Sequence, residues 1–401
     1  MIKREIYLKS LRSLKDKPIV KVLTGMRRSG KSTILKLWQE ELLANGVSKD
    51  NIFFANLESL KYAKFRDYNA LYQAITEKSN ICQGKIYILL DEVQETDEWQ
   101  RVVASCLVDF DCDIIITGSN AKLLSGELAT LLAGRYIEIK IYPLSFAEYL
   151  QFVSLSSRPS NKSKEEYFED FCRLGGLPGI HSLQDDEFHI LQYLQDIFDA
   201  ILLKDIVKRY AIRDTALLEK IIKFIMDNIG NTFSAKTIID FLRNQGRRLG
   251  AETVYNYMQA LENACLIHKA TRFDIKGKKF LETQEKYYLS DLGIRYAVIG
   301  YKSQDIAGIL ENIVFFELKR RGYSVYIGKY KDVEVDFIAQ KQNEILYFQV
   351  CFLLTEDNMS REFSPLEKIN DNFPKYVLSM NNFAVGQENG IKNINIIDFL
   401  C

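Results

Sequence analysis

The stretch over residues 20–35, VKVLTGMRRSGKSTIL, restricts the possible folds more than any other part of the chain. Its first residues are mostly apolar and β-branched, which is typical of a strand buried on both faces. A loop bounded by two glycines follows, and the chain then resumes with the spacing of a helix. Strand, glycine-bounded loop and helix in this order predict an α/β fold with a parallel sheet, in which the loop wraps phosphate groups.

The loop over residues 25–32 matches the phosphate-binding pattern GxxxxGK[ST]. In such a loop backbone N–H groups approach the phosphates, the Lys31 ammonium reaches the β and γ phosphates, and the Ser32 hydroxyl can ligate Mg²⁺. ATP and Mg²⁺ are therefore the expected ligands. The residues predicted to bind the nucleotide are Gly25, Arg28, Ser29, Gly30, Lys31, Ser32 and Thr33.

Two further strands are expected to bring polar residues to the same edge of the sheet. The first, residues 86–90, ends in Asp91 and Glu92. We expect Asp91 to hold Mg²⁺ together with Ser32, and Glu92 to polarise the attacking water as a general base; the alternative is that both acids cap the next helix. The second strand, CDIIITGSN, carries Ser119 and Asn120 at its carboxyl end, where ligands bind in open parallel sheets.

This order of strands and motifs resembles the AAA+ ATPases. The resemblance implies that Asn120, with Ser119 as the alternative, senses the γ-phosphate. It also implies that Arg135, just before a fifth strand, reaches the nucleotide of a neighbouring subunit in a homo-oligomer. The alternative for Arg135 is a cap at a helix C-terminus. Lys31, Glu92, Asn120 and Arg135 then form the predicted catalytic set.

The middle of the chain changes to helical periodicity after a polar connection. Its GGLPG sequence, residues 175–179, is interpreted as an interhelical turn or a hinge. Further on, two helices and a hairpin around KGKK resemble a winged helix-turn-helix, which binds DNA or docks protein. The residues expected to meet DNA phosphates are Arg247, Arg248, Lys276, Lys278 and Lys279.

The carboxyl-terminal region carries a helix followed by three strands and resembles the PD-(D/E)XK nucleases. Glu311 fits the helix acid of that family and Asp336 fits the acid on the second strand. At the third strand the family's ExK triplet is replaced by Gln349, Val350 and Cys351, which supply neither a carboxylate nor an ammonium group. We therefore expect a degenerate nuclease-like site without Mg²⁺-dependent cleavage; an active nuclease is the less favoured alternative.

Nearly the whole chain resembles predicted bacterial and archaeal AAA+ family ATPases that carry a C-terminal nuclease-like domain of unknown function. The predicted fold class is α/β: a P-loop NTPase sheet of AAA+ type with helices on both faces, a helical and winged-helix region, and a nuclease-like α/β domain. The expected segments are an ATPase core (1–153), a helical connector (154–230), a winged helix (231–300) and the nuclease-like domain (301–401). The predicted function is ATP hydrolysis coupled to DNA binding or remodelling; the alternative is a nucleotide-driven switch or assembly factor that binds a protein partner.

Composition limits the partners of the chain. Its formal net charge is zero, so DNA binding has to rely on local basic patches and not on a global field. The N-terminus lacks the apolar run of a signal peptide, and no uncharged apolar run reaches the roughly 18 residues of a membrane span. We therefore expect a cytoplasmic protein without a membrane partner.

Overall fold

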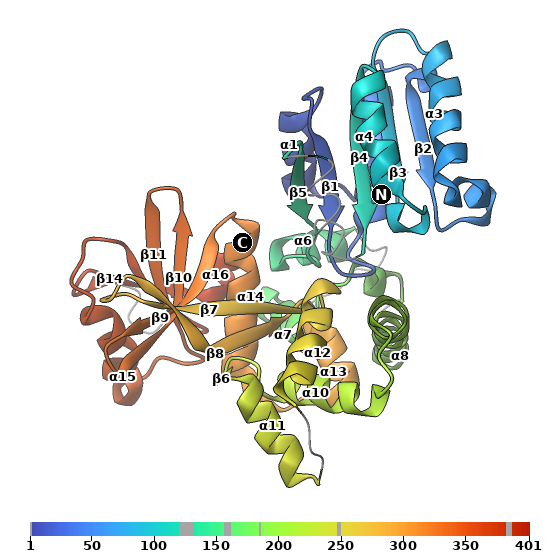
Figure 1. Cartoon of the computed structure of the whole chain (residues 1–401). Helices are drawn as coiled ribbons and strands as arrows, with labels where there is room; N and C mark the ends of the chain where they lie inside the picture. The colour runs from blue at the N-terminus through green and yellow to red at the C-terminus, as the bar shows by residue number, and fades with distance from the viewer. Residues whose placement is uncertain are drawn as a thin grey trace. The chain divides into compact units, whose positions relative to one another are not determined.

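The computed structural model describes residues 2–119, 132, 134–155, 162–183, 186–246, 250–381 and 387–401, apart from the side chains of 282, 283, 387 and 388. The chain packs as two compact units. The first unit comprises Met1–Ile141 and the short segment Asn263–Cys265, and the second comprises Tyr142–Glu262 and Leu266–Cys401. Each unit has its own sheet (Figure 1).

The described strands of the first unit form a five-stranded parallel sheet in the order β2-β3-β4-β1-β5. The strands are β1 (Val20–Thr24), β2 (Ile52–Asn56), β3 (Ile86–Asp91), β4 (Cys112–Gly118) and β5 (Tyr136–Lys140). The helices of this unit are α1 (Glu5–Leu14), α2 (Lys31–Ala44), α3 (Tyr68–Ile81) and α4 (Trp99–Asp109), with short turns η1 (Lys49–Asn51), η2 (Leu60–Arg66) and η3 (Val93–Glu95).

Alternating side chains of the strands build one apolar core on each face of this sheet. On one face, Val22 and Ile88 pack with residues of α3 and α4 such as Val102. On the other face, Leu23 and Leu89 pack with residues of α1 and α2. The predicted parallel sheet with helices on both faces is therefore confirmed, and burial on both faces explains its continuously apolar strands.

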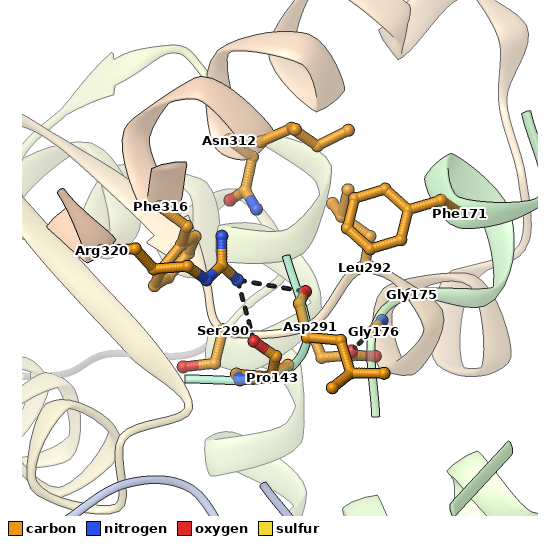
Figure 2. A pocket seen from close by; sticks show the side chains of 12 residues that line it. Pro143, Phe171, Gly175, Gly176, Ser290, Asp291, Leu292, Asn312, Phe316 and Arg320 are labelled. Atoms are coloured by element: carbon orange, nitrogen blue, oxygen red, sulfur yellow. Dashed lines mark hydrogen bonds between the residues drawn. The ribbon is translucent and has the colours of Figure 1, made fainter. Parts of the chain in front are cut away.

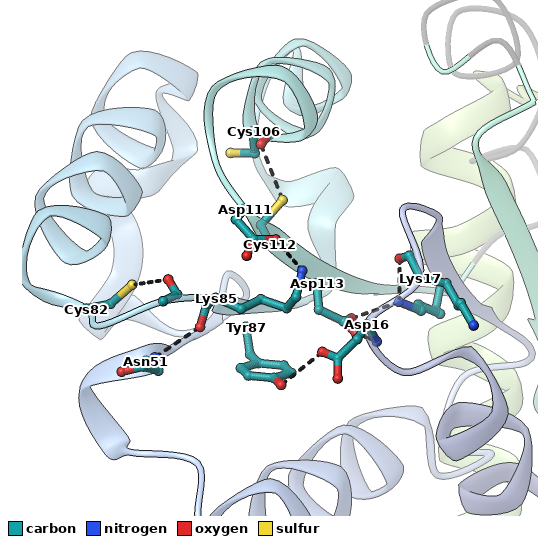
Figure 3. A network of polar contacts seen from close by, with 12 residues as sticks. Asp16, Lys17, Asn51, Cys82, Lys85, Tyr87, Cys106, Asp111, Cys112 and Asp113 are labelled. Carbon is teal, nitrogen blue, oxygen red and sulfur yellow. Dashed lines mark hydrogen bonds and ion pairs between the residues drawn. The ribbon is translucent and has the colours of Figure 1, made fainter.

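A buried ion pair joins β1 and β4 inside this unit. Lys21 Nζ lies 2.9 Å from Asp113 Oδ1, and both side chains are only 1% exposed. The other Asp113 oxygen accepts the backbone N–H of Asp16, whose carboxylate in turn accepts the hydroxyl of Tyr87 at 2.9 Å (Figure 3). The charged Lys21 can lie in an otherwise apolar strand because this network satisfies its ammonium group.

The second unit consists of helices and a mixed sheet. Its helical segments are α6 (Phe146–Ser154), α7 (Lys164–Leu174), η5 (Pro178–Ser182), α8 (Glu187–Ala200), η6 (Ile201–Val207), α9 (Lys208–Tyr210), α10 (Thr215–Asp227), α11 (Ala235–Asn244), α12 (Ala251–Asn263), α13 (Leu292–Ile299), η7 (Ser303–Asp305), α14 (Ile306–Arg320), α15 (Glu356–Glu367) and α16 (Ile396–Leu400). Its strands are β6 (Thr232–Phe233), β7 (Ile267–Asp274), β8 (Lys279–Leu289), β9 (Ser324–Tyr330), β10 (Val333–Lys341), β11 (Glu344–Val350), β12 (Lys375–Ser379), β13 (Gln387–Glu388) and β14 (Ile391–Asn395).

The described strands of this unit form one nine-stranded sheet, in the order β13-β14-β12-β11-β10-β9-β7-β8-β6. The antiparallel hairpin of β7 and β8 appears where the sequence predicts one, after the helices α11 and α12. The sequence did not predict that β7 also pairs in parallel with β9, with Phe273 opposite Gly328. The hairpin is therefore continuous with the strands of the predicted nuclease-like segment.

Helix α14 is the central helix of this unit. All of its residues from 309 to 318 are buried. Phe315 stacks on Tyr288 of β8 with ring centroids 4.5 Å apart, and it also contacts Phe337 of β10. A helix that is buried all round needs partners for its polar side chains, and Asn312 meets this need by pairing with the backbone of Leu289.

Within the described part of the chain, no helix combines the length and the apolar character that crossing a membrane requires.

Candidate functional site

The loop between β1 and α2 has the backbone geometry that its two glycines allow. Gly25 has a φ of +146°, and a Cβ at this position would lie 2.2 Å from the carbonyl oxygen of Ile141. Gly30 has a φ of 103° and forms the N-cap of α2. A larger residue at position 25 would collide with backbone, so the loop can follow this path only with glycine there.

Lys31 lies at the start of α2 and is directed back at the loop. Its side chain is 4% exposed, and its ammonium group donates to the carbonyl oxygens of Gly25 at 3.0 Å and Met26 at 3.1 Å. The positive charge is therefore held inside the loop, at the positive end of the helix dipole. A loop with these properties provides the chemistry that binds a phosphate group.

Asp91 joins three neighbouring segments at the carboxyl edge of the sheet. Its carboxylate accepts hydrogen bonds from the Ser32 hydroxyl at 3.0 Å, the Thr117 hydroxyl at 2.6 Å and the Asn56 amide at 2.8 Å. Burial raises the pKa of Asp91, while the hydrogen bonds from Thr117 and Ser32 act in the opposite direction. The hydroxyl of Ser32 and the carboxylate of Asp91 are hard oxygen ligands within one hydrogen-bond length of each other, so this pair fits a Mg²⁺ ion.

Glu92 follows Asp91 in a left-handed backbone conformation with a φ of 53°. Its backbone N–H donates to the Thr117 hydroxyl at 3.0 Å, and its side chain accepts a hydrogen bond from Gln94. Left-handed backbone is uncommon in residues other than glycine and is often found at functional sites. Thr117 contacts both acids, because its hydroxyl donates to Asp91 and accepts from the backbone of Glu92. No role was predicted from the sequence for this threonine, although it lies in the TGSN sequence.

The other residues predicted for this site differ in where they lie and in how exposed they are. Ser119 is buried directly after β4, whereas Asn120 lies outside the described residues. Arg28 and Thr33 are exposed at the loop and the first turn of α2. Arg135 is exposed immediately before β5, so its guanidinium group is accessible.

A second polar cluster surrounds Lys286 of β8 inside the second unit. Lys286 is 3% exposed, and its Nζ lies 2.9 Å from Glu311 of α14, 2.9 Å from Glu334 of β10 and 3.6 Å from Asp336 of the same strand. The structure thus brings together the predicted acids Glu311 and Asp336. It adds Glu334 and Lys286, which sequence reasoning missed because no local pattern links β8 to α14 and β10.

The charges of this cluster depend on one another. Burial alone would lower the pKa of Lys286, but the neighbouring carboxylates outweigh burial and raise it well above its usual value. Burial and the charge of Glu311 raise the pKa of Asp336 to about 8. Burial also raises the pKa of Glu311. The protonation of each acid therefore depends on Lys286 and on the other acids around it.

The third strand of this region does not complete a nuclease-like ligand set. Gln349 reaches the Asp336 backbone N–H only at 3.5 Å, and burial raises the pKa of the Cys351 thiol to about 12. Lys375 pairs with Asp371 at 3.0 Å and so has a structural partner of its own. Among the described residues, no three His, Cys, Asp or Glu side chains are placed to hold a metal ion.

The GGLPG sequence forms the turn after α7 and the first residues of η5, and its backbone contacts Asp291. The Asp291 carboxylate accepts the backbone N–H of Gly176 at 2.8 Å (Figure 2). It also accepts the backbone N–H of Ile294 at 3.1 Å. A Cβ on Gly175 would lie 2.4 Å from this carboxylate, which explains a glycine there. The cavity beside the turn has a volume of about 20 Å³, enough for one water molecule but not for a nucleotide.

The basic turn of the hairpin is exposed. Lys276, Lys278 and Lys279 all have exposed side chains, and Asp274 fixes the turn by accepting two backbone N–H groups. Phe280 beside them is 57% exposed. Of the five basic residues predicted to contact DNA, Arg247 and Arg248 lie outside the described residues.

Comparison with known proteins assigns the first unit to a family. Residues 17–150 match the family model of the AAA domain, and residues 165–305 match a domain of unknown function. Among solved structures, the Orc1 protein of Aeropyrum pernix in complex with DNA shares 11% sequence identity, with a TM-score of 0.32, over 74% of this chain and 92% of that one.

Two relatives extend over most of the chain. An uncharacterised protein of Haemophilus influenzae is 42% identical over 400 residues, which cover 100% of this chain and 98% of the relative. An uncharacterised protein of Methanocaldococcus jannaschii is 32% identical over 364 residues, covering 87% of this chain and 78% of the relative. The chain therefore belongs to the family of bacterial and archaeal AAA-domain proteins that these two relatives represent.

Proposed function

We propose that this protein binds ATP with Mg²⁺ and hydrolyses it. The observation that carries the proposal is the placement of Lys31 inside a glycine-bounded loop, next to a Ser32 hydroxyl that lies 3.0 Å from the Asp91 carboxylate. This arrangement offers an ammonium group for the phosphates and two oxygen ligands for a metal ion. The AAA domain of the family supports the same interpretation.

Each residue of the site has a role in this proposal. Mg²⁺, when bound with ATP, would neutralise charge on the β and γ phosphates. Ser32 and Asp91 would hold it, Lys31 would bind the phosphates, and Glu92 would take a proton from the attacking water. Thr117 keeps Asp91 and Glu92 in their relative positions through its two hydrogen bonds.

The remaining roles rest on the AAA+ resemblance. Asn120, or Ser119 in its place, would sense the γ-phosphate. Arg135 would complete the site of a neighbouring copy in a homo-oligomer, and its exposure before β5 supports this role.

We further propose that hydrolysis is coupled to DNA binding or remodelling through the winged-helix and nuclease-like regions. The three exposed lysines at the turn of the hairpin support DNA, because they present positive charge that phosphates can reach. The second candidate is a nucleotide-driven switch or assembly factor that binds a protein. The net charge of zero favours this alternative, since no global field attracts nucleic acid.

Nuclease activity is not part of the proposal. The ammonium group of Lys286 lies among the acids at Glu311 and Asp336, and Gln349 replaces the expected carboxylate. We therefore expect no Mg²⁺-dependent cleavage of DNA. Cleavage by the wild type that disappears in Asp336→Ala would contradict this.

The experiment that tests the function is a measurement of ATP turnover with and without duplex DNA, at low and moderate salt. Glu92→Gln is the control variant. Its side chain has nearly the same shape but cannot accept the proton, so we expect ATP binding to remain and turnover to fall by about 10²- to 10⁴-fold. Unchanged turnover in Glu92→Gln would exclude this residue as the base.

The effect of DNA on turnover in the same experiment distinguishes coupling to DNA from binding of a protein partner. Turnover that DNA stimulates, with an effect that fades as salt rises, would support coupling to DNA. Turnover that is indifferent to DNA at both salt concentrations would favour the protein-binding switch.

A further inference from the structure

The residue that precedes helix α1 contacts the phosphate-binding loop from outside. Arg4 is 4% exposed, and its guanidinium group donates to the carbonyl oxygen of Ser29 at 3.0 Å. The same guanidinium lies 4.7 Å from the ring centroid of Tyr7, so its direction is restricted by stacking. The pattern over residues 25–32 gives no sign of this contact, because Arg4 lies 25 residues before Ser29 in the sequence.

We infer that Arg4 is a positioning residue of the nucleotide site, which holds the Ser29–Gly30 peptide so that its N–H group faces the phosphates. This inference rests on the proposed binding of ATP. A trans peptide is planar, with its C=O and N–H groups pointing in opposite directions, and no described peptide is cis. Fixing the Ser29 carbonyl toward Arg4 therefore fixes the Gly30 N–H on the opposite side.

Glycine at position 30 makes such an anchor useful. A glycine populates more backbone conformations than any other residue, so the peptide beside Gly30 has little intrinsic preference for one orientation. The phosphates are bound by backbone N–H groups of this loop, and each misdirected group would weaken their binding. A charge-assisted hydrogen bond from a buried arginine restricts the peptide before the nucleotide arrives.

The anchor is itself held in place by helix α1. Arg12 near the end of α1 donates to the two carboxylate oxygens of Glu41 in α2, at 2.6 and 2.9 Å, and to Glu5 at 2.8 Å. Apolar residues of α1, including Leu8 and Leu11, pack into the core that α2 shares. Helix α1 is thus fixed to α2, the helix that begins at the loop. A substitution of Arg12 is a matched control, because Arg12 contacts α2 through Glu41 and is not bonded to the loop.

The test compares three variants of the full chain, Arg4→Met, Arg4→Lys and Arg12→Met, by titration with ATP and with ADP. For Arg4→Met we expect the Kd of both nucleotides to rise about tenfold, the effect of removing one charge-assisted hydrogen bond. Both nucleotides should be affected equally, because the loop holds phosphates that they share. Turnover at saturating ATP should stay within about twofold, since the loop binds the ground and transition states alike.

The other two variants separate positioning from general stability. Arg4→Lys keeps a cationic donor and should recover most of the affinity, whereas Arg12→Met should bind like the wild type. An Arg4→Met protein that binds both nucleotides as tightly as the wild type would overturn the inference. An equal loss in Arg12→Met would also overturn it, because the effect would then belong to the docking of α1. A wild type that binds neither nucleotide would instead overturn the proposed function, and the inference with it.

Discussion

Lys286 shows how a single buried charge can organise its surroundings. The side chain comes from β8, and the acids around it come from α14 and β10. Tyr288 donates a further hydrogen bond to Glu311 at 3.1 Å, so the acid is satisfied on more than one side. Buried carboxylates without such partners would be costly, and Lys286 is therefore expected to stabilise this part of the fold.

Replacing Lys286 by methionine should destabilise the protein strongly. The change removes the cation beside the buried acids Glu311 and Asp336 and leaves their shared negative charge without a counter-charge, for which a loss of about 3–5 kcal/mol is expected at neutral pH. Without the ammonium group both acids take up protons more readily in the folded state. The loss should therefore be smaller at about pH 5, where protonation removes the buried charge.

The measurement is the free energy of unfolding at the two pH values. Lys302→Met is the control, because Lys302 and its partner Asp227 are 40% and 45% exposed and the pair should contribute no more than about 1 kcal/mol. Equal losses in the two variants would show that Lys286 has no special role.

Asp291 should make stability depend on pH in the weakly acidic range. Burial raises the pKa of its carboxyl from 3.8 to about 6, and four backbone N–H groups lower it only in part. The folded state therefore binds the proton more tightly than the unfolded state. This contribution to stability is fully present below pH 3.8 and is lost as the pH rises through 6, with a total on the order of 3 kcal/mol.

The variant Asp291→Asn isolates this effect, because asparagine has nearly the same shape and does not titrate. We expect the free energy of unfolding of the wild type, minus that of the variant, to fall between about pH 4 and pH 6. A difference that stays constant over this range would show that Asp291 does not titrate in the folded protein with a raised pKa.

At the level of elements, the hairpin of β7 and β8 is part of both the predicted winged-helix segment and the sheet of the carboxyl-terminal strands. It follows the helices α11 and α12 in the order of a winged helix. It also extends the sheet of the carboxyl-terminal strands through the pairing of β7 with β9. The pairing covers one edge of the hairpin, so its basic turn is held by the sheet and is not a free-standing flap.

If the hairpin binds DNA, each of its exposed lysines should contribute to the salt dependence of binding. Replacing Lys276, Lys278 or Lys279 by alanine should weaken binding to any sequence. It should also reduce the slope of log K against log salt by about 0.9 for each DNA phosphate that the variant no longer neutralises. The measurement is a titration with duplex DNA at several salt concentrations.

The control for this prediction is Lys223→Ala, which removes an exposed lysine of α10. Its slope should equal that of the wild type. If the slopes are the same in all four variants and the wild type, the hairpin lysines do not contact DNA phosphates. That result would favour a protein partner.

At the level of the whole molecule, an arginine that acts on a neighbouring copy makes hydrolysis depend on assembly. Arg135→Ala and Lys31→Ala should each be inactive alone, because the first lacks the proposed finger and the second cannot bind nucleotide tightly. Mixing the two should restore part of the turnover, since an intact nucleotide site in one copy can then receive Arg135 from the other.

The mixture is compared with each variant at the same total concentration, and the wild type is also measured at increasing dilution. A mixture as inactive as its components, together with full activity of the diluted wild type, would contradict the role of Arg135 in a neighbouring site. That result would favour the alternative expected from the sequence, in which Arg135 caps a helix C-terminus.

The nucleotide site could be predicted in large part because its chemistry is local. Gly25, Gly30, Lys31 and Ser32 lie within eight consecutive residues, and the strand and helix around them have clear periodicity. Asp91 could be added because a buried strand ending in an acid is also a local pattern. Thr117 and Asn56 were missed, although both lie at strand ends, because many polar residues occupy such positions and only the sheet order selects between them.

By itself, the sequence determined the parallel α/β unit, its phosphate-binding loop and the strands that carry Asp91 and Ser119, since these follow from spacing within short segments. Only the tertiary structure decided that Arg4 holds Ser29, that Lys286 lies among Glu311, Glu334 and Asp336, and that β7 pairs with β9. These interactions join residues far apart in the chain. They are selected by which buried side chains can satisfy one another once the elements pack, and no local periodicity encodes that choice.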